Sequence, residues 1–71
     1  MNYRVRITST NRPLRERGFF SEAEANHYLS GMLDGLAVVG FSHRDYGNGT
    51  HEMWQDADGK LCTVYITLYQ N

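Results

Sequence analysis

The segment from Leu61 to Tyr69 constrains the fold more than any other part of the chain, because its side chains alternate with a period of two. Apolar side chains occupy one set of positions, and hydroxyls or aromatic rings occupy the other. The first set is Cys62, Val64, Ile66 and Leu68, and the second is Thr63, Tyr65, Thr67 and Tyr69. Successive side chains of a β-strand point to opposite faces, so we expect one core face and one half-exposed face.

Four other segments carry strand patterns, on either side of a single helical pattern. Residues 3–8 alternate cleanly, and residues 14–19 are typical of a short, charged edge strand. Residues 36–45 begin as an apolar run, and residues 51–56 surround Trp54. The predicted order of elements is therefore β-β-α-β-β-β.

Local signals mark the ends of the helix and the last turn. Ser21 and Glu24 form a capping box at the start of the helix. Asp34-Gly35 predicts its end, because glycine readily adopts the left-handed conformation that closes a helix. Gly31 lies inside the helical pattern and predicts a close approach of helix to sheet. Asp58-Gly59 is typical of a two-residue hairpin turn.

These elements predict a two-layer α+β fold, with an antiparallel sheet of four to five strands and one helix packed on one face. One helix can cover only one face of a sheet, so the other face stays open. We expect residues 1–71 to form a single domain. The predicted core is Val5, Ile7, Phe20, Ala25, Leu29, Met32, Leu33, Val39, Phe41, Val64, Ile66 and Leu68.

The size and cysteine content of the chain restrict how it is stabilised and where it acts. A domain of 71 residues has a small core, so association with a second copy into a homodimer is an expectation. Cys62 is the only cysteine, which excludes an intrachain disulfide and fits a reducing compartment. No apolar run reaches membrane-spanning length. We expect a cytoplasmic protein that does not bind a membrane.

Residues with catalytic or metal-binding chemistry are few. His43, Asp45, His51 and Glu52 could gather near one turn, and imidazoles with a carboxylate can bind zinc. Their spacing matches no specific metal motif, so a polar, solvent-exposed hairpin is the preferred interpretation. The serines lie in no nucleophile elbow, and no glycine-rich phosphate loop is present. We therefore predict a non-enzymatic protein without metal or cofactor.

The polar aromatic face of the sheet is the stronger site candidate. Tyr65 and Tyr69 line it, Trp54 or Met53 joins them depending on strand register, and the first strand adds arginines. Tyr, Trp and Arg are enriched in protein interfaces, including those between identical chains. Rings interleaved with arginines also resemble a single-stranded nucleic-acid platform, although a net charge of −1 disfavours a polyanion. A third interpretation is a solvated face with no specific role.

Charge is distributed unevenly along the chain. Residues 1–20 hold five arginines against Glu16, a balance of +4, and residues 21–71 carry −5. Such polarity can steer the protein toward a charged partner. Together with the open face, it predicts a partner-binding surface made of Tyr65, Tyr69, Trp54, Arg4, Arg6, Asp45, Glu52 and Asp56.

The strand at 3–8, the capped helix from Ser21 and the hairpin at Asp58-Gly59 together resemble small inhibitor proteins encoded by phages, of the anti-CRISPR type. The resemblance implies a non-enzymatic protein that binds a host protein or nucleoprotein complex and blocks it. The acidic residues would then imitate phosphates, or the arginines would meet an acidic patch. Two alternatives stay open: a single-stranded nucleic-acid-binding protein, and a metal-dependent enzyme that uses His43, Asp45 and His51.

Overall fold

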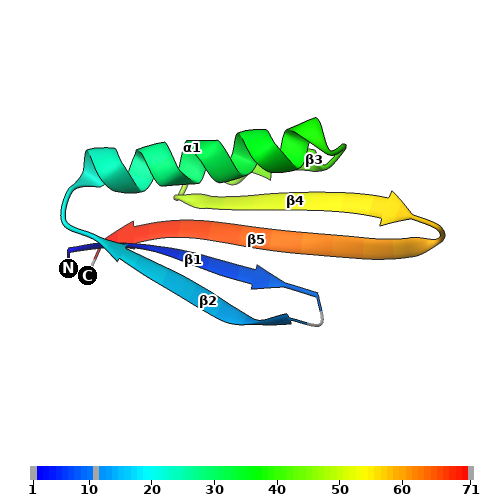
Figure 1. The fold of residues 1–71 in the computed structure, drawn as a ribbon, viewed down its shortest axis with the longest axis horizontal. Helices are drawn as coiled ribbons and strands as arrows, with labels where there is room; N and C mark the ends of the chain where they lie inside the picture. The colour runs from blue at the N-terminus through cyan, green and yellow to red at the C-terminus, as the bar shows by residue number, and fades with distance from the viewer. Residues whose placement is uncertain (1, 11, 71) are drawn as a thin grey trace.

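The computed structural model describes residues 2–10 and 12–70, and these form one helix and five strands in the predicted order. The elements are β1 (Tyr3–Ser9), β2 (Arg12–Phe19), α1 (Glu22–Val38), β3 (Ser42–Asp45), β4 (Thr50–Ala57) and β5 (Lys60–Gln70). All neighbouring strands are antiparallel, in the order β2-β1-β5-β4-β3. The α+β prediction is confirmed: α1 runs along one side of a single sheet (Figure 1).

The strand with the clearest alternation, β5, lies at the centre of the sheet. It pairs with β1 through Ile7 and Ile66, and with β4 through Met53 and Val64. These registers stack apolar side chains on the face that α1 covers. The buried core is Val5, Phe19, Ala25, Leu29, Met53, Val64 and Ile66, with Ile7, Met32, Leu33, Phe41 and Leu68 partly buried beside it.

Two predicted core residues, Phe20 and Val39, are exposed. Phe19 closes β2 and is buried, so the next side chain, Phe20, points outward and is 74% exposed. Val39 follows the last turn of α1 and is also exposed. The register of β4 places Met53 on the helix side, where it is 1% exposed, and so leaves Trp54 for the opposite face.

The helix is longer than predicted. Its start is correct, because Ser21 caps it and accepts a hydrogen bond from the Glu24 amide at 3.2 Å. Its end is not at Asp34-Gly35 but at Val38, so residues 36–41 form helix and turn rather than strand. Gly40 has a φ of +101° and donates to the Ala37 carbonyl, while the Phe41 amide donates to Leu36. These two bonds are a Schellman closure.

The expected contact between Gly31 and the sheet is wrong. No atom beyond the helix backbone lies within 4 Å of a Cβ placed at Gly31, and the residue is exposed. The residues that do approach the sheet are Ala25 and Leu29, which are buried.

α1 does not have the length and apolar character needed to cross a membrane.

The turns follow their sequence signals more closely. Asp58 and Gly59 have φ values of +54° and +77°, the left-handed pair that a two-residue hairpin of this type requires. The edge strand β2 begins at Arg12, two residues before the predicted start at residue 14. Asn11 and Pro13 also predict a turn over residues 9–13. Ser9, Arg12 and Pro13 belong to strands instead, and Asn11 lies outside the described residues. Cys62 is on the helix side of β5 by alternation but is exposed, because α1 does not cover it.

Candidate functional site

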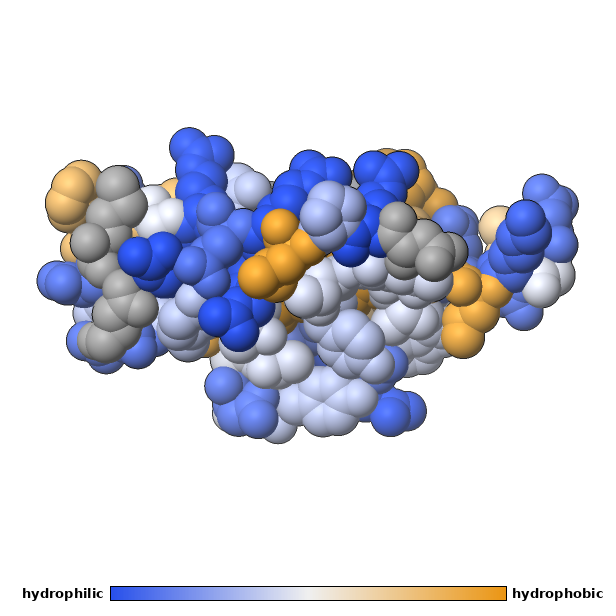
Figure 2. Space-filling model, turned by 90° about the horizontal axis from the view of Figure 1, so that it is seen from below, coloured by the Kyte–Doolittle hydropathy of each residue, from blue (hydrophilic) through white to orange (hydrophobic). Residues whose placement is uncertain are grey.

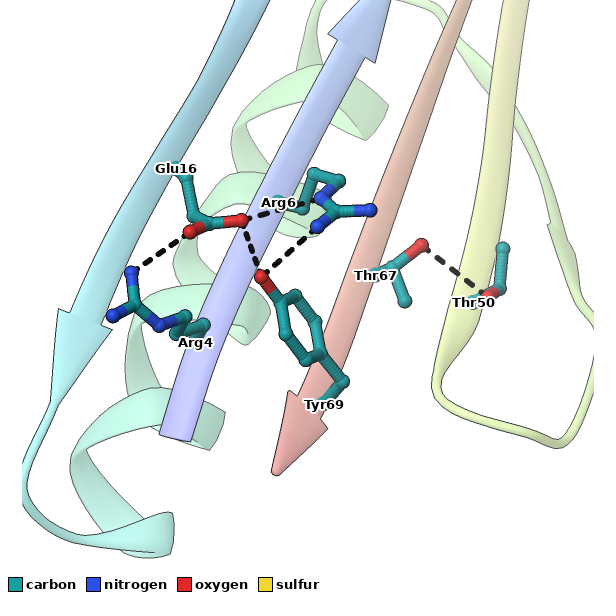
Figure 3. Close-up of polar contacts among 6 residues, drawn as sticks. All are labelled: Arg4, Arg6, Glu16, Thr50, Thr67 and Tyr69. Carbon is teal, nitrogen blue, oxygen red and sulfur yellow. Dashed lines mark hydrogen bonds and ion pairs between the residues drawn. The ribbon is translucent and has the colours of Figure 1, made fainter. Parts of the chain in front are cut away.

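The face of the sheet opposite α1 carries most of the predicted site residues. Strand alternation and register define this open face, which Figure 3 shows with the helix behind the strands. Its members are Arg4, Arg6, Thr8, Leu14, Glu16, Gly18, Ser42, Arg44, Thr50, Glu52, Trp54, Asp56, Leu61, Thr63, Tyr65, Thr67 and Tyr69. Two groups of contacting side chains stand on it, one around Glu16 and one around Glu52.

The Glu16 group joins three neighbouring strands, β2, β1 and β5 (Figure 3). Arg4 Nη1 donates to Glu16 Oε1 at 2.8 Å, and Arg6 Nε donates to Glu16 Oε2 at 3.2 Å. The Tyr69 hydroxyl also donates to Glu16 Oε2 and accepts from Arg6 Nη2 at 3.1 Å. The Arg6 guanidinium lies 4.9 Å from the centre of the Tyr69 ring. Arg6 and Tyr69 therefore contact each other as well as Glu16.

The donors around Glu16 favour its charged form. The Tyr69 hydrogen bond is the first cause that lowers the pKa of Glu16, followed by the hydrogen bonds from Arg6 and Arg4. The Glu16 side chain is 26% exposed, less than either arginine. The carboxylate thus holds the two arginines and the ring in fixed positions on the face.

The Glu52 group is built from tyrosines rather than ion pairs. Tyr46 donates to Glu52 Oε1 at 2.6 Å, and Tyr65 donates to Glu52 Oε2 at 3.1 Å. The hydrogen bond from Tyr46 is the main cause that lowers the pKa of Glu52, and the bonds to Glu52 raise the pKa of both phenols. Beside them, the Arg44 guanidinium lies 5.8 Å from the Trp54 ring centre.

The two groups differ in how much aromatic surface they leave exposed. Tyr46 is 48% exposed and Tyr65 is 42% exposed, whereas Tyr69 is only partly exposed. Arg44, Glu52 and Trp54 line a shallow hollow with two residues of β5. Seen from below the view of Figure 1, the surface is mostly hydrophilic, and its apolar residues form separate small patches (Figure 2).

The open face has balanced charge. Strand register gives it three cations, Arg4, Arg6 and Arg44, and three anions, Glu16, Glu52 and Asp56. Between the two groups, the Thr50 and Thr67 hydroxyls lie 3.3 Å apart (Figure 3). The face is thus polar and aromatic and carries no net charge.

The predicted site residues separate onto two faces of the sheet. Tyr65, Tyr69, Trp54, Arg4, Arg6, Glu52 and Asp56 lie on the open face, with Trp54 opposite Thr63 in the register. Asp45 does not join them. It pairs with His51 on the side that faces α1, because β3 and β4 alternate in step.

The histidines come together as expected, but the glutamate does not join them. His43 Nε2 and His51 Nδ1 lie 2.8 Å apart, and Asp45 Oδ1 lies 4.0 Å from His51 Nδ1. Glu52 points to the opposite face and binds tyrosines. Within residues 2–10 and 12–70, no group of three or more suitable side chains could hold a metal ion.

Three residues of these groups were not predicted as site residues: Glu16, Arg44 and Tyr46. Glu16 alternates with Arg15 and Arg17 on an edge strand, and only the pairing of Glu16 with Arg6 shows which face it shares. Tyr46 lies in a loop, where alternation gives no information.

No protein-family model matches the chain, and neither does any curated protein or solved structure.

Proposed function

We propose that this protein is a small, non-enzymatic inhibitor that binds a host protein or nucleoprotein complex through its open face and charged loops, as proteins of the anti-CRISPR type do. The partner would cover the Glu52 group and Trp54, and the Glu16 group would form the rim. Binding in this way blocks a surface on the partner and requires no reaction.

The observation that carries the proposal is the exposed aromatic surface around Glu52. Tyr46 and Tyr65 are held by hydrogen bonds to one carboxylate, so their rings are oriented before a partner arrives. A ring fixed in advance loses less conformational freedom on binding, which favours affinity. Tyr, Trp and Arg are also the residues that most often dominate binding energy.

The charge balance of the open face favours a protein over a nucleic acid. Sequence-independent binding to nucleic acid depends on unpaired cations that replace counterions on the phosphates. Arg4 and Arg6 are instead ion-paired with Glu16 at 2.8 and 3.2 Å. A gel-shift assay with single-stranded and duplex DNA and RNA at two salt concentrations checks this. Tight, salt-sensitive binding would support the nucleic-acid alternative.

Affinity capture from a lysate of the native host tests the proposal. The bait is the wild-type protein, and the test variant combines Tyr65→Ser with Tyr69→Ser, which removes both rings from β5. The matched control is Phe20→Ser, which removes a ring that is more exposed (74%, against 42% for Tyr65) from the segment between β2 and α1. Mass spectrometry identifies the captured protein, and calorimetry with the purified partner measures affinity.

We expect the wild type and Phe20→Ser to capture the same partner, and the double variant to lose it while staying folded. Equal capture by all three proteins would show that the open face is not the interface. Sedimentation of the wild type alone tests whether the open face binds a second copy of the chain. A dimer that dissociates in the double variant would show that a second copy occupies this face. A monomer leaves the face free for another protein.

A further inference from the structure

A groove of about 310 Å³ lies on the helix side of the sheet, on the face opposite the proposed interface. Its apolar wall comes from β1, the second half of α1 and the turn after it, through Ile7, Met32, Leu36 and Phe41. Each of these side chains packs against the core but stays partly exposed. The helix therefore leaves part of the apolar surface uncovered. The volume of the groove lies at the lower end of the range for ligand pockets, roughly 300–1,000 Å³.

Two arginines of the edge strand β2, Arg12 and Arg15, line the same groove. Both are exposed, and neither forms an ion pair within the part of the chain that the structure describes. Arg17, on the same strand, is different: its guanidinium lies 5.5 Å from the Phe19 ring centre and 5.0 Å from that of Tyr28. Arg12 and Arg15 are thus the cations of β2 that can bind an anion in the groove.

An apolar wall beside unpaired guanidinium groups has a specific chemical complement. Apolar ligand surface gains free energy by leaving water. The guanidinium fork binds carboxylate oxygens in pairs, with hydrogen bonds stronger than those between neutral groups. We propose that this groove binds a small amphiphilic carboxylate, whose apolar body lies against Met32, Leu36 and Phe41 and whose carboxylate binds Arg12 and Arg15. This site is independent of the partner proposed for the open face.

Octanoate is the probe, and octanol is the matched ligand without the charge. Addition of octanoate to the wild-type protein is expected to shift the backbone NMR signals of the groove residues in a saturable way. Octanol should bind more weakly. The double variant Arg12→Gln with Arg15→Gln should lose roughly tenfold or more in octanoate affinity, as expected for losing charge-assisted hydrogen bonds. Arg17→Gln, which removes one charge from the same strand outside the groove, should keep the wild-type affinity.

The single cysteine gives a second readout, because Cys62 is exposed and lines the groove. Octanoate should slow the alkylation of Cys62 by iodoacetamide, an uncharged reagent, in the wild type and in Arg17→Gln but not in the double variant. Equal binding of octanol and octanoate by the wild type would overturn the role of the arginines. Shifts that do not saturate, or no protection of Cys62, would overturn the site itself.

Discussion

Glu16 and Glu52 stand on the same face of one sheet and each accepts a hydrogen bond from a tyrosine of β5, yet they organise different surfaces. Glu16 binds two arginines directly, and its tyrosine, Tyr69, also binds one of them. Glu52 binds Tyr46 and Tyr65 through hydrogen bonds and leaves both rings exposed. The Glu16 group, whose charges are paired with one another, is suited to joining strands. The Glu52 group, whose rings are exposed and oriented, is suited to binding a partner.

The largest effect is expected from a substitution in the core of β5, the strand that supplies a tyrosine to both groups. Ile66 is fully buried on β5, between Ile7 and His51 in the register. Ile66→Ala should lower the free energy of unfolding by about 2–5 kcal/mol, because it leaves a cavity beneath the sheet. Urea denaturation measures this change. Leu61→Ala, at an exposed position of the same strand, should change it by less than about 0.5 kcal/mol. Similar values for both variants would contradict the place of Ile66 in the core.

The next prediction separates the two groups by affinity. Tyr65→Ser should weaken partner binding by about thirtyfold or more, the size typical of a central interface residue. Tyr69→Ser should have a smaller effect, because the Tyr69 ring is already in contact with Arg6 and is less exposed. Calorimetry with the captured partner compares the two. A larger loss for Tyr69→Ser would place the interface over the Glu16 group instead.

The pH dependence of stability sharpens the comparison on the acidic side. The folded pKa of Glu16 lies below its ordinary value of 4.5, chiefly because Tyr69 donates to it. Its contribution is therefore fully present above the unfolded pKa and is lost as pH falls through the folded pKa. Thermal unfolding between neutral and acidic pH should show this decline in the wild type and a shallower one in Glu16→Gln. The two curves would be parallel if the ion pairs contributed nothing.

The smallest effect is expected at alkaline pH, in the Glu52 group. The Glu52 carboxylate raises the pKa of Tyr46 and Tyr65 above the ordinary value of 10, mainly through the hydrogen bond each donates. That stabilisation is fully present below the unfolded pKa and disappears as pH rises through the folded one. Glu52→Gln should lower both values, as followed by NMR of the tyrosine rings. Glu16→Gln is the control and should leave Tyr46 and Tyr65 unchanged.

The fold was predictable where alternation or capping is local. The period of two in β5 places Tyr65 and Tyr69 on one face, and Ser21 marks the start of the helix. The end of the helix was not predictable, because Gly35 and Gly40 are both suitable closures in the sequence. Packing of Leu36 and Phe41 against the core accompanies closure at the second glycine.

The predicted residues that lie on the open face include both aromatic and charged side chains, whereas Glu16, Arg44 and Tyr46 were missed. Which face Glu16, Asp45 and Glu52 occupy depends on strand register, which the hydrogen bonds of the whole sheet determine. A shift of one residue would exchange Glu52 with Met53. Met53 is buried on the helix side, so its neighbours Glu52 and Trp54 lie on the open face. This arrangement depends on the pairing between strands, which local sequence patterns do not reveal.

The most direct test of the open face as the interface uses Trp54, the only tryptophan in the chain. Its indole N–H gives a single NMR signal, which can be followed while the captured partner is added. We expect this signal and the ring signals of Tyr65 to change first and most strongly. The methyl signals of Val38, which is 86% exposed at the end of α1, should stay unchanged. Changes confined to Val38 and the rest of α1, with Trp54 unaffected, would contradict binding through the open face.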